Sequence, residues 1–305
     1  SLSTVDLKVQ DDLTVTDDLI VGGDIDLEGA IDVNGTANLD VVDIDGAVDM
    51  ASTLQVDGAI TGSSTINGVG ISSNITNFSQ GILISNDAGT GTLDGASNNT
   101  GLGFEVFDDL TSGDQNTGVG VQALAKVTTG SNNNAIGETA LFTNTTGGNN
   151  VAMGRAALET NNADNNTAIG HQALKANSTG ATNVAVGSSA LLANTTAANG
   201  VAVGASALAA NTTGANNVAV GSGALALTVT GGFNTAIGAS ALAANLAADN
   251  TAVGYVALAA NTTGTNNIAV GNNALDSNTT GGSNVAIGQA ALATNTTANN
   301  NTAVG

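Results

Sequence analysis

Between residues 99 and 305, apolar and polar positions alternate with a fixed period. One period reads N-[VT]-A-[VI]-G-x-x-A-L-x-x-N-T-T-G-x-N, and its A-[VI]-G glycine recurs at ten steps of 17 residues and two of 16. Self-similarity at a fixed period indicates a stack of equivalent units. The repeat glycines are Gly103, Gly120, Gly137, Gly154, Gly170, Gly187, Gly204, Gly221, Gly238, Gly254, Gly271, Gly288 and Gly305.

Within one period, the pattern predicts strands and turns rather than a helix. The phrase V-A-V-G alternates large and small apolar residues, which is the period of a strand. The longest stretch without turn residues, such as residues 205–210, is too short for a stable helix. We therefore predict one β-solenoid coil per period: a strand on V-A-V, a bend at glycine, a second strand around A-L, and a turn at N-T-T-G. Coils would stack at about 4.8 Å.

Two further positions recur with the glycine. The fourth residue after it is Phe107 in the first coil and leucine in all eleven later ones: Leu124, Leu141, Leu158, Leu174, Leu191, Leu208, Leu225, Leu242, Leu258, Leu275 and Leu292. An asparagine row occupies the N-T-T-G turn: Asn144, Asn161, Asn177, Asn194, Asn211, Asn245, Asn261, Asn278 and Asn295. These side chains could form a hydrogen-bonded ladder along the stack. The alternative is that asparagine occurs there because it tolerates left-handed turns, and one residue can do both.

The first coils depart from the consensus. The residue two before the glycine is alanine in most copies but glycine at Gly101 and Gly118. Phe104 and Phe107 mark the first coil. Because terminal repeats are commonly atypical, we expect both phenylalanines to cap its open end.

A different repeat occupies residues 1–70. Apolar residues alternate over three positions and are followed by D-D, G-G, E-G, N-G or D-G turns, with a period of six residues that is broken by one step of five. We predict an all-β chain in three parts: an acidic hexad-repeat β shaft over 1–70, a junction over 71–98, and a β-roll over 99–305.

Composition points to association between chains. The chain has no cysteine or proline and only 2% aromatic residues, so a single coil has a thin core of alanine, valine and leucine. We expect an intertwined or side-by-side homotrimer, because closed symmetry covers apolar surface. The net charge of -21 argues against nucleic acid and anionic membranes as partners. No apolar stretch is long enough to span a membrane.

The A-[VI]-G-x-x-A-L-x-x-N-T-T-G phrases over residues 99–305 resemble the head repeats of trimeric autotransporter adhesins, and still more the longer repeats of phage tail fibres. The hexads resemble the shaft repeats of trimeric phage fibres. The resemblance implies a left-handed parallel β-roll, three chains about one axis, and attachment to a surface receptor such as a glycan or an outer-membrane component. The adhesin repeat is about three residues shorter, which leaves head geometry and any transferred ligand surface open.

Little in the sequence suggests catalysis. The single histidine, His171, lies at a position that accepts many residue types. With one histidine and no cysteine, we expect no classical zinc site and no histidine-assisted serine or cysteine nucleophile within one chain. We expect no enzyme and no cofactor. Acidic pairs in the hexads, Asp24 with Asp26 and Asp43 with Asp45, are weak candidates for Ca²⁺ ligands; a solvated acidic rim is the alternative.

The sequence favours a non-enzymatic trimeric fibre, similar to a phage tail fibre, that acts as a rigid shaft and adhesive head. A bacterial surface adhesin or self-assembling extracellular filament is the alternative; both place the chain outside the cell, on a virion or bacterial surface. Among the few aromatic residues, Tyr255 is the one plausible exposed platform for a sugar; a receptor would otherwise be read by shallow loops or by a tip outside this segment. A minor alternative is an ice-binding solenoid built on the threonine row Thr145, Thr195, Thr212, Thr262, Thr279 and Thr296.

Overall fold

A computed structural model describes residues 65–66, 69–75, 78–85 and 93–305. The chain divides into residues 1–61 and 62–305, and the described residues all belong to the second unit. The hexad shaft predicted for residues 1–70, with its four candidate Ca²⁺ ligands, therefore lies almost entirely outside the described residues. Gly70, at the predicted boundary, lies within strand β2.

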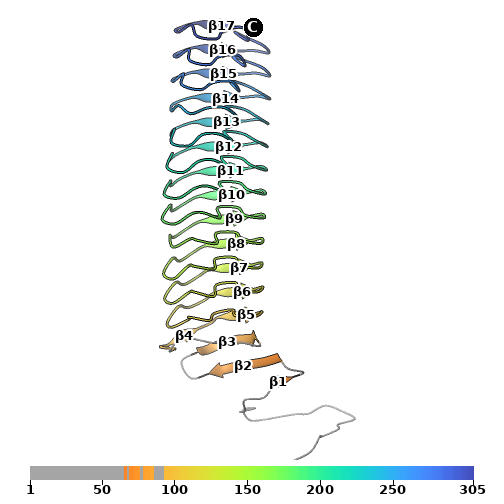
Figure 1. Ribbon diagram of the computed structural model, residues 1–305, viewed down its shortest axis with the longest axis vertical. Helices are drawn as coiled ribbons and strands as arrows, with labels where there is room; N and C mark the ends of the chain where they lie inside the picture. The colour runs from red at the N-terminus through yellow and green to blue at the C-terminus, as the bar shows by residue number, and fades with distance from the viewer. Residues whose placement is uncertain (1–64, 67–68, 76–77, 86–92) are drawn as a thin grey trace, which may run out of the picture. The chain divides into compact units, whose positions relative to one another are not determined.

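Residues 93–305 form a parallel β-solenoid of about 12 coils, as the repeat predicted (Figure 1). Each coil contributes one three-residue strand, and each strand pairs in parallel with the strand one period later, as Val184 pairs with Val201 and Val201 with Val218. No helix occurs in the described ranges. The strands are β5 (Thr100–Leu102), β6 (Thr117–Val119), β7 (Asn134–Ile136), β8 (Val151–Met153), β9 (Thr167–Ile169), β10 (Val184–Val186), β11 (Val201–Val203), β12 (Val218–Val220), β13 (Thr235–Ile237), β14 (Thr251–Val253), β15 (Ile268–Val270), β16 (Val285–Ile287) and β17 (Thr302–Val304).

A short antiparallel segment precedes the coils. Strands β1 (Thr65–Ile66), β2 (Val69–Ile75) and β3 (Phe78–Ser85) pair antiparallel in sequence order. Strand β3 then pairs in parallel with β4 (Ala96–Ser97) and with β5. Much of the predicted junction is thus a hairpin that starts the parallel ladder.

The strand predicted around A-L is wrong, because the structure has two successive turns there. In the coil that begins at Gly137, Ala140 N–H donates to Gly137 O at 3.3 Å, and Asn144 N–H donates to Leu141 O at 3.2 Å. Leu141 has a φ of 53°, which is left-handed rather than extended. Leu141 therefore reaches the core from a turn, and burial of its side chain offsets the backbone strain.

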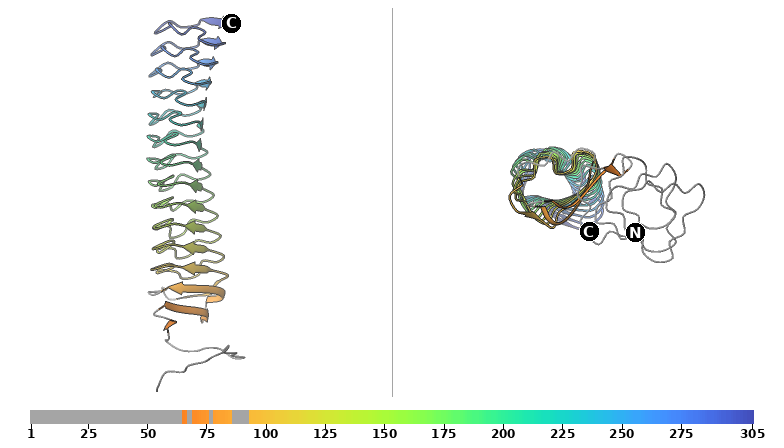
Figure 2. Two further views of the ribbon diagram at one scale, coloured as in Figure 1. Left: turned by 90° about the vertical axis from the view of Figure 1, so that its right-hand side faces the viewer. Right: turned by 90° about the horizontal axis from the view of Figure 1, so that it is seen from below.

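The side chains of each strand alternate between the interior and the outer surface. The central alanine points inward and is fully buried in β7 to β16, whereas the larger flanking residues point outward. Alanine rows and leucine rows together make one continuous core. Seen along the column, successive coils follow nearly one closed outline (Figure 2). Large apolar side chains are therefore left on the outer surface of the sheet.

The repeat glycines occupy backbone that other residues fit poorly. Those from Gly120 to Gly288 have φ between 126° and 138°. A Cβ built on Gly204 would lie 2.6 Å from the carbonyl carbon and oxygen of Gly221 in the next coil. Glycine at this position therefore permits both the bend and the close stacking of coils.

Candidate functional site

The predicted leucine row is in the core. Ten of the eleven leucines, from Leu124 to Leu275, are fully buried, and Leu292 in the last coil is partly buried. Phe107 replaces leucine in the first coil and is also buried, so it closes the core as expected. Phe104 does not, because 38% of its surface is exposed.

The predicted asparagine row forms a hydrogen-bonded ladder inside the solenoid. Asn177 Nδ2 donates to Asn161 Oδ1 at 2.7 Å, and Asn194 Nδ2 donates to Asn177 Oδ1 at 2.7 Å. The same amide nitrogens bond to carbonyls of their own turns, such as Asn177 Nδ2 to Gly180 O at 2.8 Å. The asparagines therefore act as ladder and as turn formers together. This satisfies polar atoms in a place that water does not reach.

A second buried ladder was missed by the sequence reasoning. It is formed by the asparagine four residues before each repeat glycine. Asn133 Oδ1 accepts from the backbone N–H of Asn150 at 3.0 Å, while Asn133 Nδ2 donates to Gly147 O at 2.9 Å. The signal was present, since this position is asparagine in every copy except Gly200.

The first ladder is interrupted at one coil. Thr228 stands where the neighbouring coils have Asn211 and Asn245, and its hydroxyl donates to Asn245 O at 2.7 Å. No donor then reaches Asn211 Oδ1, which is buried and has no hydrogen-bond partner. The same region carries exposed Val229, Phe233 and Leu246. Several departures from the repeat therefore occur together in these coils.

The two 16-residue coils have one residue fewer in the turn, and they carry different side chains at the shortened position. In the first, Asn162 Oδ1 accepts from the backbone N–H groups of Thr145 and Thr146, each at 3.0 Å. In a 17-residue coil a backbone carbonyl does this, as Thr145 O does for Thr128 and Thr129. The second short coil has Leu246 at the position of Asn162.

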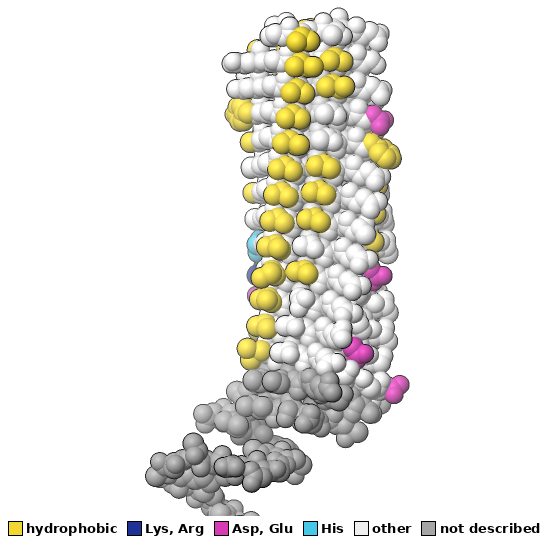
Figure 3. All heavy atoms as spheres, turned by 180° about the vertical axis from the view of Figure 1, so that it is seen from behind, with side chains coloured by type: hydrophobic (Ala, Val, Ile, Leu, Met, Phe, Trp, Pro, Cys, Tyr) yellow, Lys and Arg dark blue, Asp and Glu magenta, His cyan; other side chains and the backbone are white. Residues whose placement is uncertain are grey.

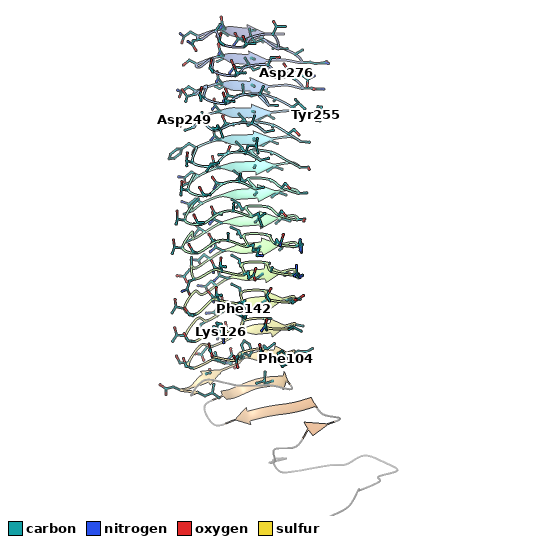
Figure 4. All side chains as sticks on the ribbon, viewed as in Figure 1. Phe104, Lys126, Phe142, Asp249, Tyr255 and Asp276 are labelled. Carbon is teal, nitrogen blue, oxygen red and sulfur yellow. The ribbon has the colours of Figure 1, made fainter. Side chains whose placement is uncertain are left out.

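Charged side chains gather in the early coils. Lys126 Nζ lies 3.1 Å from Asp108 Oδ2 and 3.3 Å from Asp109 Oδ2, and Figure 4 shows its place on the column. Hydrogen bonds with Asp108 and then Asp109 raise the pKa of Lys126 above its ordinary value. Such exposed pairs each contribute little to stability.

His171 belongs to a charged column on the outside. Arg155 Nε lies 3.3 Å from Glu138 Oε2, and Arg155 Nη1 lies 3.5 Å from His171 Nε2. Lys175 pairs with Glu159 at 3.2 Å. In the described ranges, no group of three or more histidine, aspartate, glutamate or cysteine residues is arranged to hold a metal ion.

A stripe of apolar side chains follows the outer face of the sheet. We call it the outer stripe and define it as the residues directly before the repeat glycines. Figure 3 shows it as an unbroken row along the described coils, with a second, partial row beside it. Its members are Leu102, Val119, Ile136, Met153, Ile169, Val186, Val203, Val220, Ile237, Val253, Val270, Ile287 and Val304.

Tyr255 and the threonine row, the remaining candidates for a binding surface, do not belong to the outer stripe. Tyr255 is 59% exposed, as expected for a platform, but Phe233 is more exposed at 66%. The hydroxyls of Thr195 and Thr212 donate to the carbonyls of Thr212 and Val229, both at 3.1 Å. Each of these half-buried hydroxyls is thus bonded to a backbone carbonyl of the next coil.

Two further findings concern the class of protein to which the chain belongs. No helix among the described residues is long and apolar enough to cross a bilayer. In comparisons with known proteins, no family model, no curated sequence and no solved structure matches the chain. The fold itself defines the described part of the chain as a parallel β-solenoid repeat protein.

Proposed function

We propose that this protein is a non-enzymatic homotrimeric fibre, similar to a phage tail fibre, that holds an adhesive surface away from its anchor. The outer stripe is the observation that carries the proposal. Monomeric soluble proteins rarely expose contiguous apolar patches of more than a few hundred Å², and larger ones mark interaction surfaces. Here the row continues through the described coils; nine of its thirteen side chains are exposed and the other four are half-buried.

The period of the stripe favours another copy of this chain as the occupant. Its side chains recur at the strand spacing of about 4.8 Å. Only a surface with the same spacing can match it over its whole length, and a second copy carries that spacing by construction. The resemblance of the repeats to trimeric fibre proteins favours three copies. In that assembly the stripes would face one another, and the turns would remain outside.

The rest of the surface supports a structural and adhesive role. The described coils after Lys175 carry two charged side chains, Asp249 and Asp276. Repeated coils supply length, while the turns supply an outward surface for a receptor, such as a glycan or an outer-membrane component. We place the protein outside the cell, on a virion or a bacterial surface. A bacterial adhesin or a self-assembling filament is the alternative use of the same stripe.

Light scattering of the purified protein tests the assembly. We expect about three times the chain mass of 29.3 kDa, unchanged on dilution. The variant Val203→Lys/Val220→Lys places two charges in the stripe and should reduce the mass to that of one chain. Thr213→Lys/Thr230→Lys adds the same charge at exposed turn positions and should leave the mass unchanged.

A wild-type protein that is a stable monomer would overturn the trimer. A large and polydisperse mass would instead support the filament. If the stripe variant stays trimeric, the chains associate through another surface.

A further inference from the structure

One column of side chains points outward from every turn. It contains the residue five before each repeat glycine, and we call it the outer turn column. All its members are exposed and have φ between 56° and 62°. They are Asn98, Gln115, Asn132, Asn149, Asn165, Thr182, Asn199, Asn216, Phe233, Asp249, Asn266, Ser283 and Asn300. Phe233 is the single apolar member.

Asparagine suits this column and phenylalanine does not. Asparagine visits left-handed backbone more readily than other residues, whereas a bulky residue there is an outlier. Leu208 has a similar φ of 52°, but its side chain is fully buried, so packing offsets the strain. Phe233, at φ 59°, is 66% exposed. Its strain is therefore offset by much less packing than that of Leu208, and strain of this kind is found at functional positions.

Two polar side chains flank the ring. Phe233 N–H donates to Ala215 O at 3.1 Å, and Asp249 N–H donates to Gly232 O at 3.2 Å. These bonds place Asn216, Phe233 and Asp249 on three consecutive rungs, about 4.8 Å apart. Neither the Asn216 carboxamide nor the Asp249 carboxylate makes a hydrogen bond or ion pair with a described residue. The ring thus lies between one free amide and one free carboxylate.

We propose that Asn216, Phe233 and Asp249 form a binding site for a neutral saccharide. The apolar face of a pyranose ring packs on the phenyl ring, and its hydroxyls donate to Asp249 and exchange hydrogen bonds with Asn216. A carboxylate with no described basic group around it disfavours acidic sugars. The site deepens the proposed function, on which it rests, by giving the attachment surface a place and a ligand class.

The site lies away from the other exposed aromatic residue. Figure 4 shows Asp249 and Tyr255 at opposite edges of the column. Tyr255 directly follows Gly254 and belongs to a different column of the coil. It therefore offers a matched control: an exposed aromatic side chain in a neighbouring coil, outside the proposed site.

The test probes the full chain with a printed array of neutral, amino and acidic saccharides. Wild type and Tyr255→Ser should bind the same neutral saccharides. Phe233→Asn should weaken binding more than about tenfold and also raise the melting temperature, since it restores the residue type of the column. Asp249→Asn keeps the shape and should weaken binding by a smaller factor.

Several outcomes would overturn the site. These are no binding to any saccharide, preference for acidic saccharides, unchanged binding in Phe233→Asn, or a loss in Tyr255→Ser equal to that in Phe233→Asn. Light scattering of the same samples separates this failure from that of the fibre. A trimer that binds no saccharide loses only the site. A Phe233→Asn variant that dissociates assigns Phe233 to contact between chains instead.

Discussion

Val106 and Gly118 face each other inside the first coils, and each accounts for the other. A Cβ built on Gly118 would lie 2.8 Å from Val106 Cγ1, which is closer than real contacts allow. Val106 stands where the later coils have Ala123, Ala140 and Ala157, and Gly118 stands where they have alanine. The two departures from the repeat therefore compensate each other, because the larger side chain of Val106 occupies the space that the missing methyl of Gly118 leaves. Gly101 is related in the same way to Leu83 and Phe107.

This relationship predicts strong coupling between the two positions. Gly118→Ala alone should lower the free energy of unfolding by about 2 kcal/mol through overpacking. With Val106→Ala present, the added methyl has room, so the loss in the double variant should be at least about 1 kcal/mol smaller than the sum of the single losses. Chemical denaturation of the four proteins measures the cycle. Additive losses would show that the two side chains do not share the space.

Repair of the asparagine ladder should stabilise the protein. Thr228→Asn supplies an amide that can donate to the buried, unpartnered Asn211 Oδ1. We expect a gain of about 1 kcal/mol, because a buried acceptor becomes satisfied. Thr228→Val is the control, since it keeps the shape, removes the hydroxyl and should lower stability. Thermal unfolding ranks the three proteins, and a destabilised Thr228→Asn would refute the ladder as the reason for the orphaned oxygen.

The repeat glycine should not tolerate a side chain. Gly204→Ala forces a Cβ within 2.6 Å of Gly221 backbone atoms at a φ of 134°, so we expect a loss of about 3 kcal/mol or more. Gly223 is the control. Its φ is 67°, and a Cβ built on it would have Ser240 Oγ, 3.7 Å away, as its nearest neighbour. Gly223→Ser should cost less than about 1 kcal/mol, because Ser206 and Ser240 occupy the equivalent positions with a similar φ. Circular dichroism melting compares the two, and equal losses would argue against stacking as the cause.

The ion pairs of Lys126 should make a small contribution that is lost in alkali. Asp108 and Asp109 raise the pKa of Lys126 in the folded state. The stabilisation is therefore complete below the unfolded value of about 10.5 and fades as the pH rises through the higher folded value. At pH about 8, Lys126→Met should be less stable by under about 1 kcal/mol. The difference should vanish above the folded pKa in a pH series of melting temperatures; a difference that persists would assign it to packing of the lysine stem.

Much of the fold follows from the sequence because the period is explicit. The repeat glycines, the leucine core and the short V-A-V strand could all be predicted. Which side chains of V-A-V face the interior could not be predicted, because the alternation is the same with either face inward. Alanine lies inside because the leucine of the following turn fills the same interior, and this contact depends on a left-handed leucine that no local rule suggests.

The candidate site was partly hidden for a similar reason. The sequence indicates Tyr255 as the one plausible exposed aromatic platform. The local sequence around Phe233 predicts no role for it. Only its position in the outer turn column shows that it points outward. The comparison of each residue with its equivalents one period away was the signal available in the sequence.

The two short coils have a consequence for how the chain finds its fold. In a run of identical coils, a slip by one whole period would replace each contact with an equivalent one, so the correct pairing would have little energetic advantage. The first 16-residue coil reduces this degeneracy, because Asn162 Oδ1 accepts from the backbone N–H groups of Thr145 and Thr146, a side-chain contact that the other described coils do not show at this position. Val106 with Gly118 marks the start of the column in the same way. The departures from the repeat therefore favour the correct pairing of coils over a pairing shifted by one period.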